Sequence, residues 1–202
     1  MEYLIASMKK VILHILLEAY VQHITKRWKN FVKTAELRDN VTILESSLLQ
    51  QEIIMMFALF NKDERYCFNY IMSLLEIMKK LDPVIIYLDQ GNIRKQINKA
   101  LRERDKEWLD KVSSWDKYEY AKARGLKGIE AFIAVLEETK ELQLRILAQN
   151  RCKYLMVDNS DYNWERVQRE IKGYLFPESK VPASSFSVGE FLKKIWTKIR
   201  LY

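Results

Sequence analysis

The stretch Pro83-Val84-Ile85-Ile86-Tyr87-Leu88-Asp89 decides the fold of this chain. Its centre is a short run of apolar and β-branched residues, and it ends in an aspartate. A run of this kind predicts a strand that is buried on both faces, as the strands of parallel sheets are. A basic segment, which we expect to be helical over about 92–104, follows directly. A buried strand that leads into a helix indicates a parallel α/β fold.

Two further short apolar runs, at 41–44 and 154–157, predict strands of the same kind. The helices are expected at about 2–37, 48–60, 61–80, 92–104, 125–149 and 164–175, with a broken helical stretch over 108–120. This order predicts a helix-rich, three-layer α/β domain over residues 1–176, with a parallel sheet of about three strands. Ligands of such sheets bind beyond the carboxyl ends of the strands, where Glu45, Asp89 and Asp158 are expected.

The composition is that of a globular protein with one domain and an appendage. The chain has 202 residues, of which 49% are apolar and 30% charged, with a net charge of +7. The positive charge favours an anionic partner, such as a nucleotide or a membrane surface. We expect no sequence-specific binding of nucleic acid, because the sequence has no zinc-finger spacing, RNA-recognition signature or long lysine block.

The cysteines and the N-terminal region favour a cytoplasmic protein. Cys67 and Cys152 lie far apart in the sequence, which is typical of free thiols in a reducing compartment. His14 and His23 do not have the spacing of a metal site. The apolar run over 11–17 is interrupted by His14 and has no cleavage site, so we expect no signal peptide. No apolar run is long enough to span a bilayer.

Residues 177–202 form a separate unit in the sequence, in which a loop with two prolines precedes a basic amphipathic pattern over 189–200. Its apolar residues fall at helical spacing: Phe191, Leu192, Ile195, Trp196 and Ile199. A helix of this kind packs on the rest of the domain or lies on an anionic membrane surface, and the sequence leaves both possibilities open.

Several short sequence motifs occur in the same order as in a known protein family. They are Arg27-Trp28-Lys29-Asn30-Phe31-Val32, Leu44-Glu45-Ser46-Ser47-Leu48-Leu49-Gln50, Ile86-Tyr87-Leu88-Asp89, Arg102-Glu103-Arg104-Asp105-Lys106-Glu107-Trp108, Arg124-Gly125-Leu126-Lys127-Gly128 and Val157-Asp158-Asn159-Ser160-Asp161-Tyr162-Asn163-Trp164. With them, residues 27–175 resemble bacterial P-loop NTPases of the thymidylate kinase and deoxynucleoside kinase group. The resemblance implies a P-loop-kinase-like sheet, a nucleoside or nucleotide substrate, and ATP with Mg²⁺ as cofactors.

The sequence departs from that family at the loop that binds the phosphates of ATP. This loop needs glycines so that backbone N–H groups can converge on phosphate oxygens. All five glycines lie at or beyond Gly91, so the first ninety residues cannot contain the loop. We therefore expect a truncated sheet that lacks a strand between 41–45 and 84–88. The N-terminal helix could cover this gap or a second chain could complete the sheet, and the unpaired backbone predicts marginal stability or self-association.

The resemblance also implies roles for individual residues. Glu45 would take the proton from a nucleoside hydroxyl or help to hold Mg²⁺, although a solvated or capping glutamate fits as well. Arg102 and Arg104, with Arg94 as a third candidate, would bind phosphate as lid arginines. Residues 94–106 hold six basic side chains and two acidic ones, which favours an anion site. The other interpretation is a solvated helix face.

The loop after the last predicted strand would border the nucleotide base in that family. It contains Asn159 and Ser160, which are equally well suited to a turn or a helix cap. Three functional hypotheses follow. The chain is a kinase-like phosphotransferase that cannot catalyse alone, a non-catalytic module that binds a nucleotide or a partner, or part of a longer reading frame.

Overall fold

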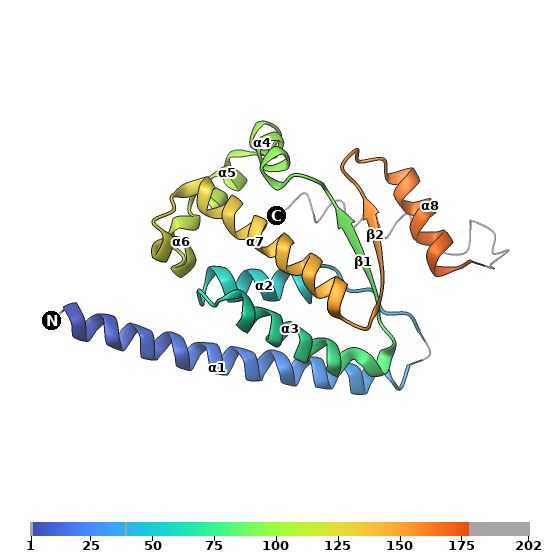
Figure 1. Cartoon of the computed structure of the whole chain (residues 1–202), viewed down its shortest axis with the longest axis horizontal. Coiled ribbons are helices and arrows are strands. Elements are labelled where there is room, and N and C mark those ends of the chain that lie inside the picture. The colour runs from blue at the N-terminus through green and yellow to red at the C-terminus, as the bar shows by residue number, and fades with distance from the viewer. Residues whose placement is uncertain (1, 39, 178–202) are drawn as a thin grey trace.

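The computed structural model describes residues 2–38 and 40–177, which form a helical body with a small sheet at one end (Figure 1). The helices are α1 (Glu2–Ala35), α2 (Leu49–Ala58), α3 (Glu64–Met78), α4 (Ile93–Glu103), α5 (Lys106–Ser113), α6 (Glu119–Arg124), α7 (Gly128–Gln149) and α8 (Trp164–Leu175). The strands are β1 (Val84–Asp89) and β2 (Lys153–Asp158), and the short 3-10 turns η1 (Lys79–Leu81) and η2 (Trp115–Lys117) follow α3 and α5. The described chain is therefore a mostly helical α/β structure.

The helices begin where side chains can cap them. Asp63 accepts a hydrogen bond from the Tyr66 N–H at 2.8 Å at the start of α3, and Asn92 does the same for Lys95 at the start of α4. Such caps satisfy backbone donors that have no partner inside the helix. The predicted helices are confirmed to within a few residues at most of their ends.

The main core lies between α1, α2, α3 and α7. On α1, the residues at positions 17, 24, 28 and 32 are buried and form one stripe along the helix. They pack in the same cluster as the fully buried Ile53, Ile71 and Ile146 of the three other helices. These helices hold one end of the sheet because β1 and β2 are joined to α3 and α7 by short connections.

The two strands are parallel, with Val84 opposite Lys153 at one end of the ladder and Asp89 opposite Asp158 at the other. Alternate side chains of β1 point to different layers, as the period of a strand requires. Ile85 and Tyr87 pack against the helical body, whereas Ile86 and Leu88 pack in a cluster with the buried Val167 of α8. The sheet thus lies between the helical body and α8, and the predicted α/β class with a parallel sheet is confirmed.

The prediction of a strand at 41–44 is wrong. This segment has no regular structure, and the sheet of the described residues has two strands rather than three. Val41, Ile43 and Leu44 are 74%, 48% and 43% exposed. A short run becomes a strand only where a neighbouring strand pairs with its backbone, and no strand within the described part of the chain pairs with this run. The β-branched composition alone could not supply that partner.

Two sequence-based expectations concern membranes. Among residues 2–38 and 40–177, no helix combines the length and the apolar character that crossing a bilayer requires. The amphipathic pattern over 189–200, and most of the proposed unit over 177–202, lies outside the described residues.

Candidate functional site

The carboxyl ends of β1 and β2 meet at one edge of the sheet, where Asp89 and Asp158 are opposite each other. Asp89 Oδ1 accepts hydrogen bonds from the Gly91 N–H at 2.8 Å and from Lys140 Nζ at 2.5 Å. Lys140 Nζ also donates to the Gly91 carbonyl at 2.6 Å. Gly91 has a φ of +74°, which a residue with a side chain adopts only with strain. These contacts fix the turn through which β1 enters α4.

The loop after β2 lies directly against this turn. The Asn159 N–H donates to the Asp89 carbonyl at 2.7 Å, and a Cβ placed on Gly91 would be 3.5 Å from the Ser160 Cβ. Asp158 Oδ1 accepts from the Ser160 N–H at 2.8 Å, and this bond holds the pKa of Asp158 below its ordinary value. Ser160 is therefore a turn residue, as one of the two interpretations of the sequence had it.

Asn159 is also a turn residue through its backbone, since its carbonyl accepts a hydrogen bond from the Tyr162 N–H at 3.3 Å, but its side chain caps no helix of the described part of the chain. Its side chain is completely buried, and neither Oδ1 nor Nδ2 has a hydrogen-bond partner among the described residues. A buried amide without partners costs about 1–3 kcal/mol per polar group, so such groups usually bind a water molecule or a ligand. The amide offers one acceptor and two donor hydrogens beside the carboxyl edge of the sheet.

The loop is also joined to α4. The Tyr162 hydroxyl donates to Gln96 Oε1, and Gln96 Nε2 donates to the Gln90 carbonyl at 2.9 Å. Lys99 Nζ lies 4.3 Å from the centre of the Tyr162 ring, a cation–π contact. The turn, the loop and the first half of α4 therefore form one connected surface.

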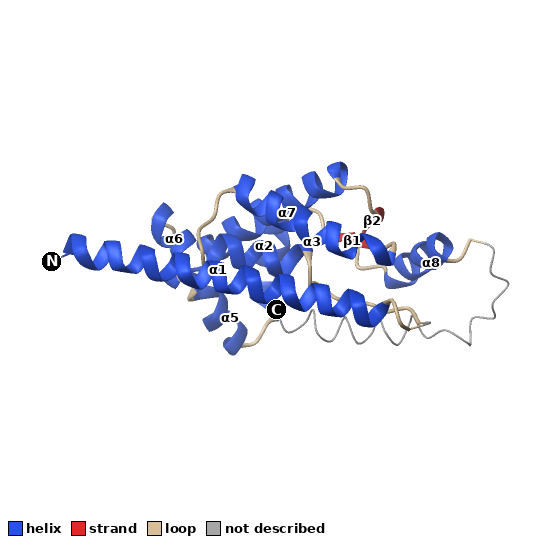
Figure 2. Cartoon of the chain, turned by 90° about the horizontal axis from the view of Figure 1, so that it is seen from below, coloured by secondary structure: helices blue, strands red, loops and turns tan. Residues whose placement is uncertain are grey.

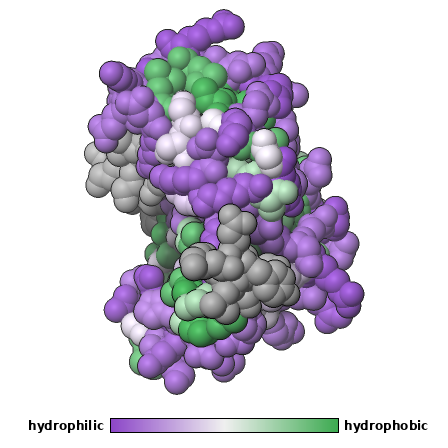
Figure 3. Space-filling view, turned by 90° about the vertical axis from the view of Figure 1, so that its left-hand side faces the viewer, coloured by the Kyte–Doolittle hydropathy of each residue, from purple (hydrophilic) through white to green (hydrophobic). Residues whose placement is uncertain are grey.

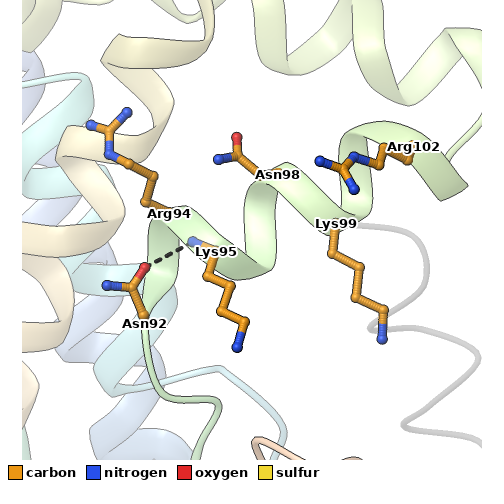
Figure 4. A pocket seen from close by; sticks show the side chains of 6 residues that line it. All are labelled: Asn92, Arg94, Lys95, Asn98, Lys99 and Arg102. Carbon is orange, nitrogen blue, oxygen red and sulfur yellow. Dashed lines mark hydrogen bonds between the residues drawn. The ribbon is translucent and has the colours of Figure 1, made fainter.

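A basic groove of about 540 Å³ runs along α4 (Figure 4). Its lining comes from one face of the helix: Asn92, Arg94, Lys95, Asn98, Lys99 and Arg102. In Figure 4, Lys95 and Lys99 extend to the same side of α4. Lys95, Lys99 and Arg102 form no ion pair with a carboxylate of the described residues, so their charge is available to an anion from solution.

Of the three predicted lid arginines, Arg94 and Arg102 both line the basic groove, whereas Arg104 is not among its lining residues. Arg94 makes a two-pronged ion pair with Glu130, at 2.8 and 2.9 Å, and this pair lowers the pKa of Glu130. The Arg104 guanidinium lies 5.9 Å from the centre of the Trp108 ring. Arg102 lines the basic groove. Arg102 lies in the last turn of α4, whereas Arg104 follows the end of the helix with an extended backbone, so helical spacing does not bring the two side chains together.

Glu45 does not stand at the end of a strand, because residues 41–45 have no regular structure. Its carbonyl accepts a hydrogen bond from the Ser47 hydroxyl at 2.7 Å, in the turn that leads towards α2. The expectation that a strand would carry Glu45 to the carboxyl edge is thus wrong. The catalytic role that the resemblance implies for Glu45 depended on this position, so the structure gives it no support.

Sequence reasoning missed Lys140, although it links α7 to the turn after β1. A signal was present: Lys140 falls four residues after Leu136 and three before Gln143, in line with the inward side of α7. A charged residue at such a position usually has a partner. The partner, Asp89, is 51 positions away and could not be identified from the sequence.

Within the described residues, no group of three or more His, Cys, Asp or Glu side chains could hold a metal ion. No family model matches the chain, and searches of curated proteins and of solved structures found no match.

Proposed function

We propose that this protein binds a nucleotide, or another phosphorylated molecule of similar size, along the basic groove of α4 without transferring the phosphate by itself. The observation that carries the proposal is the set of three cations, Lys95, Lys99 and Arg102, that share one groove and have no carboxylate partner. Ammonium and guanidinium groups on one helix face suit the closely spaced charges of a diphosphate.

The surroundings of the groove support a nucleotide over a simple anion. The groove begins next to the carboxyl edge of the parallel strands, the usual place of ligands in α/β sheets. Asn159 offers hydrogen bonds that nothing else among the described residues uses. The Asn159 side chain is completely buried, so a base or a sugar would reach this amide only by displacing the loop after β2. The resemblance to P-loop kinases points to the same ligand class.

The chemistry of the donors supports binding more than catalysis. Phosphoryl transfer usually needs carboxylates that hold Mg²⁺ and a group that orients the nucleophile. The carboxylate of Asp89 already accepts two hydrogen bonds, one of them from Lys140, and Glu45 lies on an irregular segment. The residues present fit the phosphates of a nucleotide but not a Mg²⁺ site, so we derive no catalytic step.

The test is a titration of the full chain with ADP, ATP, pyrophosphate and unphosphorylated nucleosides, by calorimetry and by thermal shift. At a given concentration, a ligand that binds only the folded state raises the melting temperature more the more tightly it binds. We expect ADP and ATP to bind with a dissociation constant that rises with salt, because the contacts are ionic. Nucleosides should bind more weakly than their phosphates.

Two triple variants make the test specific. The variant Lys95→Gln/Lys99→Gln/Arg102→Gln removes the charges of the groove. It should raise the dissociation constant for ADP at least tenfold. Replacing the three exposed lysines of α1 at positions 26, 29 and 33 by glutamine removes the same charge elsewhere and should leave ADP binding unchanged. Equal losses in both variants, or no response of the parent protein to any phosphate compound, would refute the proposal.

A further inference from the structure

The outer face of α1 carries apolar side chains that no part of the described chain covers. Leu17, Ile24 and Trp28 are buried against the body. On the opposite side of the helix, five large side chains are each 53–58% exposed: Met8, Val11, Ile12, Ile15 and Leu16. Their spacing of three and four residues places them in one strip. A gathered apolar strip on a protein surface marks an interaction site more often than scattered apolar residues do.

The same face becomes basic in the second half of α1. About five turns of helix separate residues that are eighteen positions apart, so such residues lie on one line. Lys26 follows Met8 in this way, Lys29 follows Val11, and Lys33 follows Ile15. The three lysines line a shallow hollow on the helix. None of them pairs with a carboxylate of the described residues.

This two-part strip faces outwards along a helix of 34 residues. In Figure 1, α1 lies below all the other helices, and in Figure 2, which views the molecule from below, it runs across the near side. Figure 3 views the end of the molecule at which α1 begins, and apolar surface (green) is visible in the lower part of this view. A flat surface could therefore approach the outer face of α1 without meeting another helix of residues 40–177 first.

We propose that the outer face of α1 docks on the surface of a bilayer that contains anionic lipids. The first half of the strip would enter the boundary between headgroups and acyl chains, and the lysines of the second half would contact the anionic headgroups. A single surface of this chemistry satisfies both halves at once.

A second copy of the chain would be a suitable partner for the apolar half of the strip but not for its lysines. An antiparallel pair of complete α1 helices would place the apolar side chains of Met8 and Val11 of one copy opposite Lys29 and Lys26 of the other. A pair that overlaps only over residues 8–16 would leave the lysines without acidic partners, because residues 8–16 contain no aspartate or glutamate. The lysines of the strip therefore favour an anionic bilayer over a second copy of the chain, although the apolar half alone would fit either partner.

The experiment is co-sedimentation of the full chain with vesicles of phosphatidylcholine alone and of phosphatidylcholine mixed with phosphatidylglycerol. We expect binding to the mixed vesicles, weakening with salt. Lys26→Gln/Lys29→Gln/Lys33→Gln should weaken it about fivefold per lysine, and on the order of a hundredfold in total. Ile12→Ser/Ile15→Ser should also abolish most of the binding. All five positions are exposed, so folding should persist, which circular dichroism checks.

Two matched variants separate this face from a general effect. The α4 triple variant removes the same charge, and Val41→Ser/Ile43→Ser removes exposed apolar groups elsewhere. Both should bind vesicles like the parent protein. The proposal is overturned if all variants lose binding equally, or if the α1 variants keep it. It is also overturned if the parent ignores vesicles and forms a dimer that Ile12→Ser/Ile15→Ser abolishes. Because nucleotide binding is measured separately, either proposal can fail alone.

Discussion

The buried carboxylate of Glu52 offers the sharpest test of the helical body. Glu52 lies on α2 and is only 4% exposed. Its Oε2 accepts hydrogen bonds from the hydroxyls of Tyr20 on α1 and Tyr70 on α3, each at 3.0 Å. Three helices therefore meet at one oxygen. Burial raises the pKa of Glu52, although both hydroxyl bonds oppose this shift.

The perturbation is the removal of the two hydroxyls by Tyr20→Phe and Tyr70→Phe. A hydrogen bond to a charged group contributes about 1.5–3 kcal/mol, so each single variant should lose about that much of the free energy of unfolding. Because both hydroxyls serve the same oxygen, the second removal should cost more than the first. The double variant should therefore lose more than the sum of the two single losses, which is about 3–6 kcal/mol and already a large share of the 5–15 kcal/mol that is typical of a domain.

The assay is urea unfolding at neutral pH, followed by tryptophan fluorescence and circular dichroism. Tyr118→Phe is the matched control, since the Tyr118 ring packs on Trp115 and its hydroxyl makes no hydrogen bond among the described residues. The control should change stability by less than about 0.5 kcal/mol. A double variant as stable as the control would show that the Glu52 cluster does not join the three helices.

The same cluster predicts a pH dependence with a definite sign. The folded-state pKa of Glu52 is above its ordinary value, so the folded state holds this proton more tightly than the unfolded state. The contribution to stability is complete below the ordinary carboxyl pKa and is lost as the pH rises through the raised pKa. Glu52→Gln cannot titrate and should flatten this part of the curve. An unchanged curve for Glu52→Gln would contradict the assignment.

Two further predictions concern the site and the core. Lys140→Met leaves Asp89 with only the Gly91 N–H and should cost about 1.5–3 kcal/mol, measured by urea unfolding, whereas Lys140→Arg should retain part of the contact. Ile71, which is completely buried between the main helices, should lose about 2–5 kcal/mol when changed to Ala, and an effect under about 1 kcal/mol would place it outside the core.

The sequence predicted the local elements because their causes are local. The helical period of α7 and the capping residues Asp63 and Asn92 lie within the segments that they shape. The two real strands followed from short apolar runs beside turn residues. The same rule failed at 41–44, because a run of four residues carries no information about whether another strand lies beside it.

The candidate site depended far more on tertiary structure. The sequence placed Asn159 in a loop and Arg102 on a basic helix, but it could not show that the Asn159 amide is buried without partners or that Arg94 is paired with Glu130. It also grouped Arg104 with Arg102, which the end of α4 separates. Such facts arise from contacts between residues that are tens of positions apart.

The sequence alone was enough to predict the type and the approximate ends of most helices and strands, and with them the mostly helical α/β class. Only the tertiary structure decided which strands pair, which charges are neutralised and which face of α1 stays uncovered. The physical reason is that propensities and caps act within a few residues, whereas burial, ion pairs and strand ladders join distant parts of the chain. Lys140 and Asp89, 51 positions apart, are the clearest case.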